Sequence, residues 1–452
     1  FAGEPSLLTR KADADLAAMF RARRATVAVI GLGYVGLPLV KAIVDAGFIG
    51  LGIDIDPAKI RKLQEGISYI AQFDPAWFTQ QIAEGRFACT TEFSALAAAD
   101  AIIICVPTPL TKHREPDLSY VVGTARSIAA HLRPGQLVVL ESTTYPGTTT
   151  EILVPELEAS GLACGVDFHV AFSPEREDPG NPDYGTRSIP KVVGGMGDAA
   201  RDIAIALYDQ IVVTTVPVSS TAAAEAVKIT ENIFRAVNIA LVNELKLIYG
   251  AMGIDVWEVI EAAKTKPFGF MPFYPGPGLG GHCIPIDPFY LTWKARAFDM
   301  STRLVELAGE INTAMPTHVV TVCMEALNAR FAKGLNGARV LLVGLAYKKN
   351  VGDIRESPGL VLIRLLESHG AIVDFHDPHV PEIGMTREHP EVAGRRSVPV
   401  SAESLAAYDL ALIATDHDDL DYAGLVAASR LVVDTRNACA RHGIVSDKVV
   451  KA

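Results

Sequence analysis

Cysteine is scarce in this chain, and its few copies are scattered. The 452 residues hold six cysteines and no CxxC pair, whereas a structural zinc site or a disulfide framework needs closely spaced cysteines. We therefore exclude both and predict a reducing, cytoplasmic environment. The cysteines are Cys89, Cys105, Cys164, Cys283, Cys323 and Cys439.

An excess of positive charge and long apolar runs are also lacking. Lys and Arg number 41 against 52 Asp and Glu, and the formal net charge of −11 argues against a nucleic acid as the main partner. No apolar run reaches the roughly 18 residues of a membrane-spanning helix. No basic segment followed by an apolar one opens the chain, so we expect neither a membrane span nor a secretory signal. The length is enough for about three globular domains.

The first clear pattern follows a charged segment over 13–24, which predicts a surface helix. A short apolar strand over 27–30 runs into GLGYVG at 31–36, a helix continues from there, and a second strand ends at Asp54. Such a unit binds a dinucleotide: the first glycine makes the turn, the second admits the pyrophosphate, and the third packs helix on strand. An acid at the position of Asp54 binds the adenine ribose and repels a 2′-phosphate, which favours NAD over NADP.

Three later strands end in polar, proline-bearing loops. The apolar runs and their loops are 101–106 with PTP at 107–109, 137–140 with ESTTYPG at 141–147, and 169–172 with SPEREDPG at 173–180. Each loop by itself is typical of an ordinary turn. Because the carboxyl ends of parallel strands share one sheet edge, where open α/β sheets bind ligands, their recurrence predicts a site.

A long helix is expected next. Residues 221–249 contain neither Gly nor Pro, and Glu225, Lys228 and Asn232 fall on one helical face. A solvated polar stripe would have the same spacing. Apolar neighbours such as Ile229 instead indicate a buried helix, on which a Lys needs a partner or a task.

The most unusual stretch is GPGLGGHCIPIDP at 276–288. Four glycines and three prolines surround Cys283. Glycine lets a backbone approach a ligand closely, and Asp287 follows four positions on, so the pattern predicts a positioned nucleophile. A buried Cys in a tight turn is the alternative, although such a residue needs no glycine-rich loop.

The opening pattern then recurs without its phosphate glycines. ARVLLVGLAYK at 338–348 echoes the first strand and turn, and VDFHDP at 373–378 echoes IDIDP at 53–57. This predicts a second doubly wound unit. Lys348 and DIRESP at 353–358 take the place of the glycines, and this edge could hold a different phosphate ligand or be a solvated run of charges.

Taken in order, these motifs resemble those of the nucleotide-sugar 6-dehydrogenases, the family of UDP-glucose, GDP-mannose and UDP-N-acetylhexosamine dehydrogenases. The resemblance covers the chain from about 26 to 437. Its most specific parts are GLGYVG at 31–36, STTYPGT at 142–148, SPERE at 173–177, the helix with Glu225, Lys228 and Asn232, GGHCIPIDP at 280–288 and YKKNVGDIRESP at 347–358. SPEREDPGN at 173–181 and the His-Cys-Ile-Pro spelling are most similar to the branch that acts on UDP-N-acetylglucosamine.

The resemblance implies an α/β protein with two Rossmann-like doubly wound domains joined by a central helical domain. Residues 1–25 would be an N-terminal extension, 26–218 the NAD-binding domain, 219–330 the central and dimerisation domain, and 331–452 the domain that binds the UDP-sugar. It also implies a cytoplasmic oxidoreductase of polysaccharide biosynthesis that uses NAD. The partners would be a UDP-sugar substrate and further copies of the chain in a homodimer or larger homo-oligomer, without nucleic acid or membrane.

The implied chemistry is a four-electron oxidation of the sugar's C6 hydroxyl, at the seam between the NAD and UDP domains, with two NAD molecules used in turn. Cys283 would add to the C6 aldehyde, giving a thiohemiacetal and, after the second oxidation, a thioester that water cleaves to the uronic acid. A nearby cation would lower the pKa of that thiol. Lys228 and Asn232 would hold the oxyanion that develops at C6.

The predicted site residues form three groups, and no metal is expected. The catalytic group is Cys283, Lys228, Asn232, Asp287 (which would orient Lys228 or water) and Glu175 and Thr143 (bases acting through water). The cofactor group is Gly31, Gly33, Tyr34, Val35, Gly36, Asp54, Lys59, Pro107, Thr108 and Thr143. The substrate group is Glu175, Arg176, Lys228, Asn232, Tyr274, Gly276, Gly280, Lys348 and Arg355.

The chain departs from parts of the family pattern. The UDP-glucose branch typically has Lys just before the loop Asp, where this chain has Ile286, and the Arg that enters a neighbouring subunit's site in some members is not evident near 264–267. UDP-N-acetylmannosamine, UDP-N-acetylgalactosamine and UDP-glucose stay open as substrates. A two-electron β-hydroxyacid dehydrogenase would share a Lys/Asn helix but needs neither Cys283 nor a second Rossmann-like unit. A non-enzymatic nucleotide sensor would not need Cys283, Lys228 and Asn232 together.

Overall fold

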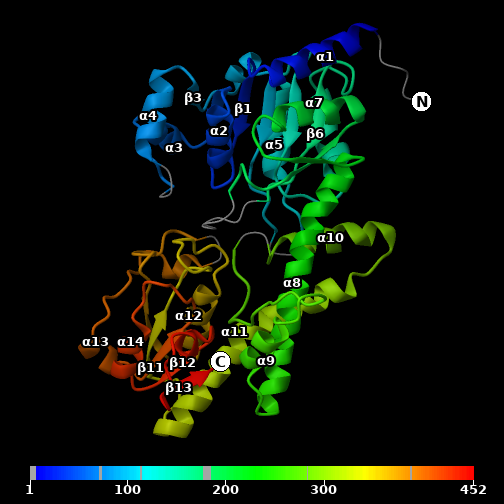
Figure 1. Cartoon of the computed structure of the whole chain (residues 1–452). Coiled ribbons are helices and arrows are strands. Elements are labelled where there is room, and N and C mark those ends of the chain that lie inside the picture. Colours follow the sequence, from blue (N-terminus) through cyan, green and yellow to red (C-terminus); the bar gives the residue numbers. More distant parts are fainter. Residues whose placement is uncertain (1–6, 71–73, 112–114, 177–184, 282–283, 387–388) are drawn as a thin grey trace. The chain divides into compact units, whose positions relative to one another are not determined.

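The computed structural model describes residues 7–70, 74–111, 115–176, 185–281, 284–386 and 389–452, with side chains from residue 13 onward. The chain forms two compact units. The first holds the residues up to Glu231 together with Phe289–Met300, and the second holds Asn232–Pro288 and Ser301–Ala452. Each unit is built on its own sheet, and long helices complete them (Figure 1). The predicted α/β class with two doubly wound sheets is confirmed.

The sheet of the first unit has eight strands in the order β3-β2-β1-β4-β5-β6-β7-β8. Neighbouring strands are parallel except β6 and β7. The strand order reverses between β1 and β4, and doubly wound sheets bind their ligands at such a switch point. The strands are β1 (Thr26–Ile30), β2 (Ile49–Ile53), β3 (Phe87–Thr90), β4 (Ala101–Ile104), β5 (Leu137–Leu140), β6 (His169–Phe172), β7 (Lys191–Gly195) and β8 (Thr215–Pro217).

Alternate strand residues of this sheet face two different helix layers. Val27 and Val29 pack with α1–α4 and α7, whereas Ala28 and Ile30 pack with α5, α6 and the start of α8. Because helices cover both faces, the central strands are apolar throughout. The helices are α1 (Leu7–Arg21), α2 (Gly36–Asp45), α3 (Pro57–Gln64), α4 (Pro75–Ala83), α5 (Ser119–Ala129), α6 (Val154–Glu158), α7 (Asp198–Tyr208) and α8 (Thr221–Ala251), with short turns η1 (Phe93–Ala98) and η2 (Thr149–Leu153).

Helix α1 ties the N-terminal extension to the first unit. Leu16, Ala17 and Phe20 are buried in the core, and α1 lies against α7 (Figure 1). Asp13 on this helix forms an ion pair of 2.9 Å with His169 at the start of β6. The expected helix is present, but one side of it is part of the core.

The sheet of the second unit has five parallel strands in the order β10-β9-β11-β12-β13. Helices α11 and α12 cover one face, and α13, α14 and α15 cover the other. The strands are β9 (Arg339–Val343), β10 (Ile372–His376), β11 (Leu410–Ile413), β12 (Val432–Asp434) and β13 (Val449–Lys451). The remaining helices are α9 (Val256–Ala263), α10 (Asp287–Ala295), α11 (Arg303–Phe331), α12 (Pro358–Ser368), α13 (Ala402–Ala406), α14 (Tyr422–Ala428) and α15 (Ala438–Arg441), with η3 (Arg296–Phe298) and η4 (Pro390–Val392).

The two sheets repeat one turn, in the segments that the sequence showed to be similar. Gly31 after β1 and Gly344 after β9 each donate an N–H to the last residue of the neighbouring strand, at 2.8 Å in both units. The acid that follows that strand is Asp54 in the first unit and Asp377 in the second. Asp374, which also belongs to the VDFHDP segment, lies inside β10.

The Asp377 carboxylate accepts hydrogen bonds from the turn that follows β9 in the second unit. Its Oδ2 accepts the N–H groups of Leu345 and Ala346 at 2.6 and 2.8 Å, and it also contacts the buried ring of His417 at 3.0 Å. These contacts lower the pKa of Asp377 against the effect of its burial. The turn amides that a Rossmann unit offers to a phosphate are therefore bound to the protein's own carboxylate.

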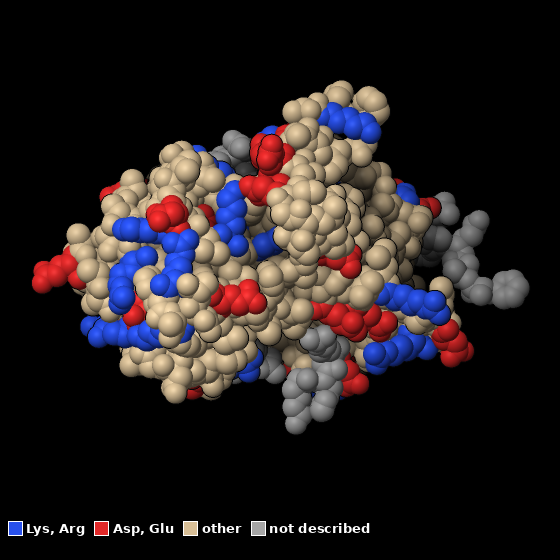
Figure 2. All heavy atoms as spheres, turned by 90° about the horizontal axis from the view of Figure 1, so that it is seen from below, with Lys and Arg blue, Asp and Glu red and all other residues tan. Residues whose placement is uncertain are grey.

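Charges of both signs share the surface. Figure 2 shows acidic and basic side chains interleaved over the visible face. Several form ion pairs, for example Lys333 with Asp409 at 2.5 Å and Arg395 with Glu367 at 2.6 Å. Within the part of the chain that the structure describes, no helix offers an apolar stretch long enough to cross a bilayer.

Candidate active site

The glycine turn after β1 has the geometry of a dinucleotide site. Gly31 has φ of +92°, and a Cβ at this position would lie 2.5 Å from the carbonyl oxygen of Cys105. A Cβ at Gly36 would lie 1.9 Å from the carbonyl oxygen of Gly31, so α2 packs directly on the turn. Gly33 faces open space, with nothing within 4 Å of an added Cβ. The turn therefore leaves its backbone open where a pyrophosphate would approach.

Asp54 holds this turn in place. Its carboxylate is almost fully buried and accepts the Leu32 N–H at 2.9 Å and the Lys59 ammonium at 3.0 Å. Both of these donors bond Oδ2, whereas Oδ1 accepts the Asp56 N–H at 2.9 Å and retains a lone pair for a ribose hydroxyl. Tyr34 is exposed beside the turn, and Val35 is partly buried at its end. These residues fit the adenosine end of NAD.

The ends of β4 and β5 supply the next predicted residues. Pro107 is exposed, whereas Thr108 is buried, and its carbonyl oxygen accepts the Tyr290 hydroxyl at 2.8 Å. Tyr290 belongs to α10 and is itself fully buried. Thr143, after β5, is partly exposed. The structure thus brings Thr108 and Thr143 to the same sheet edge as the glycine turn.

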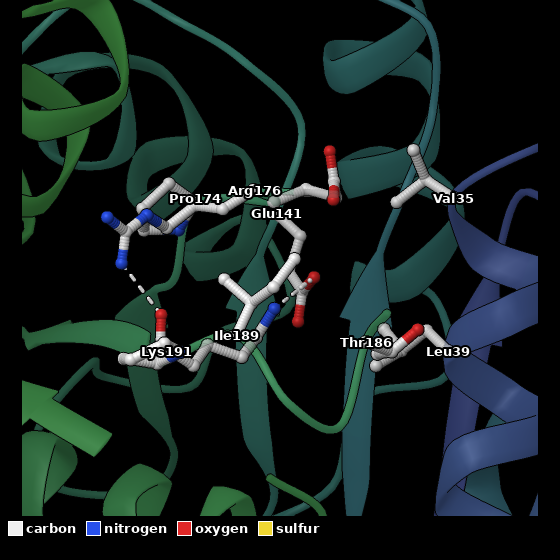
Figure 3. A pocket seen from close by; sticks show the side chains of 10 residues that line it. Val35, Leu39, Glu141, Pro174, Arg176, Thr186, Ile189 and Lys191 are labelled. Carbon is white, nitrogen blue, oxygen red and sulfur yellow. Dashed lines mark hydrogen bonds and ion pairs between the residues drawn. The ribbon is translucent and has the colours of Figure 1, made fainter. Parts of the chain in front are cut away.

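A pocket lies at this edge of the first unit (Figure 3). Val35 and Leu39 of α2 form one wall, and Glu141, directly after β5, stands across from them beside Lys191. The Lys191 ammonium contacts the Glu141 carboxylate at 2.8 Å. The pocket is lined by Val35, Leu39, Glu141, Pro174, Glu175, Arg176, Thr186, Ile189, Pro190 and Lys191.

The loop after β6 is fastened to α8. The Lys228 ammonium donates to the carbonyl oxygen of Glu175 at 2.5 Å and lies 3.8 Å from its carboxylate. Arg176 pairs with Glu231 through two nitrogens, at 2.5 and 3.3 Å, and donates to the Pro190 carbonyl at 2.7 Å. The predicted neighbours Glu175 and Lys228 are therefore together, and the Arg176 guanidinium is used to hold the loop.

Glu225, one turn before Lys228, has a supporting role. It is fully buried and accepts the N–H groups of Gly147 and Thr149, at 2.5 and 2.8 Å, and the Thr149 hydroxyl at 2.7 Å. Burial raises the pKa of Glu225, although these hydrogen bonds oppose the rise. The carboxylate anchors the loop that starts at Glu141 and carries Thr143.

In the second unit, Asn232 and Asp287 form a buried pair. The side-chain nitrogen of Asn232 donates to Asp287 at 2.5 Å, and the two side chains are 3% and 1% exposed. Asp287 is the first residue of α10, where a carboxylate is stabilised by the helix N-terminus. Cys283, the predicted nucleophile, lies outside the described residues, as does His282.

The glycines before Cys283 pack against the loop over residues 347–358, which is called the basic loop below. A Cβ at Gly280 would lie 2.6 Å from Cβ of Tyr347, and one at Gly281, whose φ is +82°, would lie 2.9 Å from the Tyr347 ring. The Gly281 N–H donates to the carbonyl of Arg355 at 3.0 Å. The two segments that the sequence analysis assigned to one substrate site are therefore neighbours within one unit.

Gly276 makes room for a cation that the sequence analysis missed. A Cβ there would lie 2.6 Å from a guanidinium nitrogen of Arg436, which follows β12. Lys246 of α8 interacts electrostatically with Arg436, and its ammonium has no hydrogen-bond partner among the described residues. Burial, and then the charge of Arg436, lower the pKa of Lys246 to about 8. Two partly buried cations, of which Arg436 lies beside Gly276, suit an anionic ligand.

The other predicted substrate residues have local contacts. Tyr274 stacks on Trp257, with ring centroids 5.5 Å apart, and its hydroxyl donates to Glu261 at 2.8 Å. Arg355 pairs with Asp353 at 2.6 Å. Lys348 is half-buried.

Three histidine and acidic groups come close enough to suggest a metal. Ligand atoms of His379, His417 and Asp419 lie within 4.8 Å of one another. Both ring nitrogens of His417 are already engaged, by the Asn350 N–H at 2.9 Å and by Asp377 at 3.0 Å. The cluster therefore supports the turn of the second unit through hydrogen bonds.

The missed residues differ in how far the sequence could have shown them. Arg436 follows a strand end, so the argument used for the first unit could have found it. Glu141 opens a loop that was recognised, but its partner Lys191 is fifty positions away and has no motif of its own. Tyr290 sits in an apolar segment with no polar signal.

Comparison with known proteins gives one family for most of the chain. Family models match its NAD binding domain over residues 25–212, its central domain over 222–314 and its UDP binding domain over 341–441. The UDP-N-acetyl-D-glucosamine 6-dehydrogenase of Pseudomonas aeruginosa is 37% identical over 400 residues, 88% of this chain and 92% of that protein. The NDP-N-acetyl-D-galactosaminuronic acid dehydrogenase of Ralstonia nicotianae is 33% identical, covering 91% of this chain and 95% of that protein.

A solved structure agrees with these sequence matches. The structure of the UDP-D-ManNAc dehydrogenase from Pyrococcus horikoshii superposes with a TM-score of 0.83 at 32% identity, covering 94% of this chain and 97% of that one. The resemblance noted from the motifs, and NAD as the cofactor, are thereby confirmed. The chain belongs to the UDP-glucose/GDP-mannose dehydrogenase family and is an NAD-dependent nucleotide-sugar dehydrogenase.

Proposed function

We propose that this enzyme oxidises the C6 hydroxyl of a UDP-N-acetylhexosamine to the carboxylate, with UDP-N-acetylglucosamine as the preferred substrate. The observation that carries the proposal is the buried Asn232–Asp287 pair. Asp287 follows Cys283 by four positions in the sequence, and Asn232 lies on the same helix as Lys228. An amide donor, an ammonium and a thiol are the groups that a two-stage oxidation of an alcohol through a thioester requires.

The first unit holds the cofactor. Gly33 leaves the backbone open for the pyrophosphate, Asp54 and Lys59 receive the adenine ribose, and Gly31 and Gly36 set the turn. Tyr34, Val35, Pro107, Thr108 and Thr143 border the remaining length of the dinucleotide. When bound, NAD accepts hydride from the substrate carbon.

The catalytic residues act in sequence on C6. Lys228 and Asn232 donate to the oxygen of C6 and stabilise the negative charge that develops there. The Cys283 thiolate adds to the aldehyde carbon, and the thiohemiacetal oxygen is held by the same donors. After the second oxidation gives a thioester, a water activated by Glu175 or Thr143 attacks it, and Cys283 leaves as a thiolate. Asp287 orients Asn232 throughout.

The second unit binds the anionic part of the substrate. Lys348 and Arg355 supply positive charge on the basic loop. Arg436 adds a partly buried cation next to Gly276, and Lys246 interacts electrostatically with Arg436. Gly280 lets the thiol-bearing loop approach closely, and the Tyr274 ring offers an apolar face. Arg176 and Glu175 complete the proposed sugar contacts from the first unit.

Self-association through the central helices is part of the same proposal. About half or more of the side-chain surface is exposed, from 48% to 64%, at Leu241 and Ile248 on α8, at Met252 just after it, and at Leu304 and Leu307 on α11. Apolar surface of this kind marks an interface in a protein that is otherwise well packed. A second copy of the chain is the partner that the family resemblance implies. The proposed location is the cytoplasm.

Product identification tests the function directly. Incubation with NAD and UDP-N-acetylglucosamine should yield the uronic acid by mass spectrometry, with two NADH formed per sugar. One NADH per substrate would indicate two-electron chemistry instead and contradict the proposal. A substrate panel with the mannosamine and galactosamine epimers and UDP-glucose ranks the sugars. Cys283→Ala should form no uronate, and a normal rate in that variant would rule out the thioester route.

A further inference from the structure

The floor of the pocket in the first unit holds a buried ion pair that the proposed chemistry does not use. Glu141 is 2% exposed and Lys191 is 7% exposed. One carboxylate oxygen of Glu141 accepts from Lys191 at 2.8 Å, and the other accepts the hydroxyl of the fully buried Tyr208 at 2.5 Å. The Lys191 ammonium also lies over the Tyr208 ring, 5.1 Å from its centroid.

This arrangement is more elaborate than stability requires. Taking two charges out of water costs several kcal/mol, and apolar residues of the same volume often serve a core as well or better. Glu141 and Lys191 lie on different strand ends, fifty positions apart, and both line the pocket. Burial and the Glu141 charge raise the pKa of Tyr208 well above its ordinary range, so the phenol stays a donor.

The pair presents a donor and an acceptor side by side. Each carboxylate oxygen of Glu141 can accept a further hydrogen bond, and the Lys191 ammonium has three donors, of which one is used by Glu141. A primary amide is the matching ligand, since it carries N–H donors and a carbonyl acceptor in one plane. The pair is neutral as a whole, so a charged group in this place would meet one like charge at close range.

The position of the pocket fits one amide in particular. Val35, the residue just before the last glycine of the dinucleotide turn, forms the facing wall, and Leu39, Pro174 and Ile189 make the rest of the lining largely apolar (Figure 3). A flat aromatic ring with an amide substituent suits such a space. The pocket also lies at the carboxyl ends of β5 and β6, beyond the glycine turn along the sheet edge.

We propose that Glu141 and Lys191 together bind the carboxamide of the nicotinamide ring, with Glu141 accepting from its nitrogen and Lys191 donating to its oxygen. Tyr208 is a positioning residue that fixes the Glu141 carboxylate from behind. This assignment rests on the proposed NAD site of the first unit. It adds a recognition element for the reactive end of the cofactor, which the glycine turn and Asp54 do not contact.

Binding of cofactor analogues, measured by calorimetry without sugar substrate, tests the assignment. In 3-acetylpyridine adenine dinucleotide a methyl group replaces the amide nitrogen, so the wild-type enzyme should bind it at least about tenfold more weakly than NAD, the usual value of one hydrogen bond to a charged group. Nicotinic acid adenine dinucleotide, with a carboxylate against Glu141, should bind more weakly still.

A double variant removes the pair without leaving a buried charge. Glu141→Met combined with Lys191→Met should bind NAD and the acetyl analogue with nearly equal affinity, with a lower melting temperature because the buried Tyr208 hydroxyl loses its acceptor. Lys59→Gln, at the adenosine end, is the matched control and should weaken both ligands equally. An unchanged preference for NAD in the folded double variant would overturn the assignment. Failure of wild-type enzyme to bind NAD at all would instead refute the NAD site on which it rests.

Discussion

Replacing Asn232 by alanine is expected to lower kcat about 100-fold with little change in the KM for the nucleotide sugar. Asn232 is 3% exposed and donates to Asp287 at 2.5 Å, so its amide is held in one orientation. A fixed donor aimed at a developing oxyanion contributes about 3 kcal/mol to the barrier, and each 1.36 kcal/mol is a factor of ten in rate. Because the charge on the C6 oxygen develops in the transition state, the loss appears in kcat.

The assay is steady-state NADH formation with saturating UDP-N-acetylglucosamine. Asn238→Ala is the matched control, because Asn238 lies on the same helix, is partly exposed, and bonds only to the backbone carbonyl of Phe234 among the contacts described, at 2.7 Å. Its kcat should stay within twofold of the wild type. A twofold or smaller effect of Asn232→Ala would show that the amide does not stabilise the oxyanion, and a tenfold rise in KM at constant kcat would show that it binds ground state and transition state alike.

Three further results are expected. Gly36→Ala should abolish soluble folding, because its Cβ would lie 1.9 Å from a carbonyl oxygen. Gly33→Ala should keep the wild-type melting temperature but bind NAD more weakly in calorimetry. Equal stability of the two variants would contradict the turn geometry. Glu225→Ala should destabilise the fold by about 2–5 kcal/mol in urea titration, because three donors lose their buried acceptor; a change below 1 kcal/mol would show that water replaces it. The folded protein lowers the pKa of Lys246 from 10.5 to about 8, so the KM of the wild type for the nucleotide sugar should rise above pH 8 as the ammonium loses its charge. The free energy of unfolding should also rise over this pH range, because the unfolded chain binds more protons than the folded one. Lys246→Met should show neither pH dependence.

The sequence predicted those parts of the site that are local. Gly31, Gly33, Gly36 and Asp54 could be assigned because a strand, a turn, a helix and a second strand follow one another within one motif, and the chemistry of each position is set by its neighbours. The pairing of Asn232 with Asp287 was not predicted, because the two lie on different helices and Asp287 was expected to orient Lys228 or water.

What could not be predicted depends on register and on distant contacts. Asp374 and Asp377 are of the same type and three positions apart. To tell which of them lies in the turn, one must know where β10 ends, and that is set by its pairing with β9. Lys191 meets Glu141 because β7 runs antiparallel to β6 at the far side of the sheet, an exception that periodicity does not reveal. The position of Arg436 after β12 marks it as a candidate, but its contact with the distant Gly276 has no signal in the sequence.

The filled turn of the second unit has a consequence for turnover. Since Asp377 accepts the N–H groups of Leu345 and Ala346, those two amides are not available to a phosphate. Under the proposed four-electron oxidation, both hydrides would then pass to dinucleotides bound in the first unit, with NADH exchanged for NAD between the two steps. The proposed thiohemiacetal with Cys283 would keep the aldehyde on the protein during that exchange.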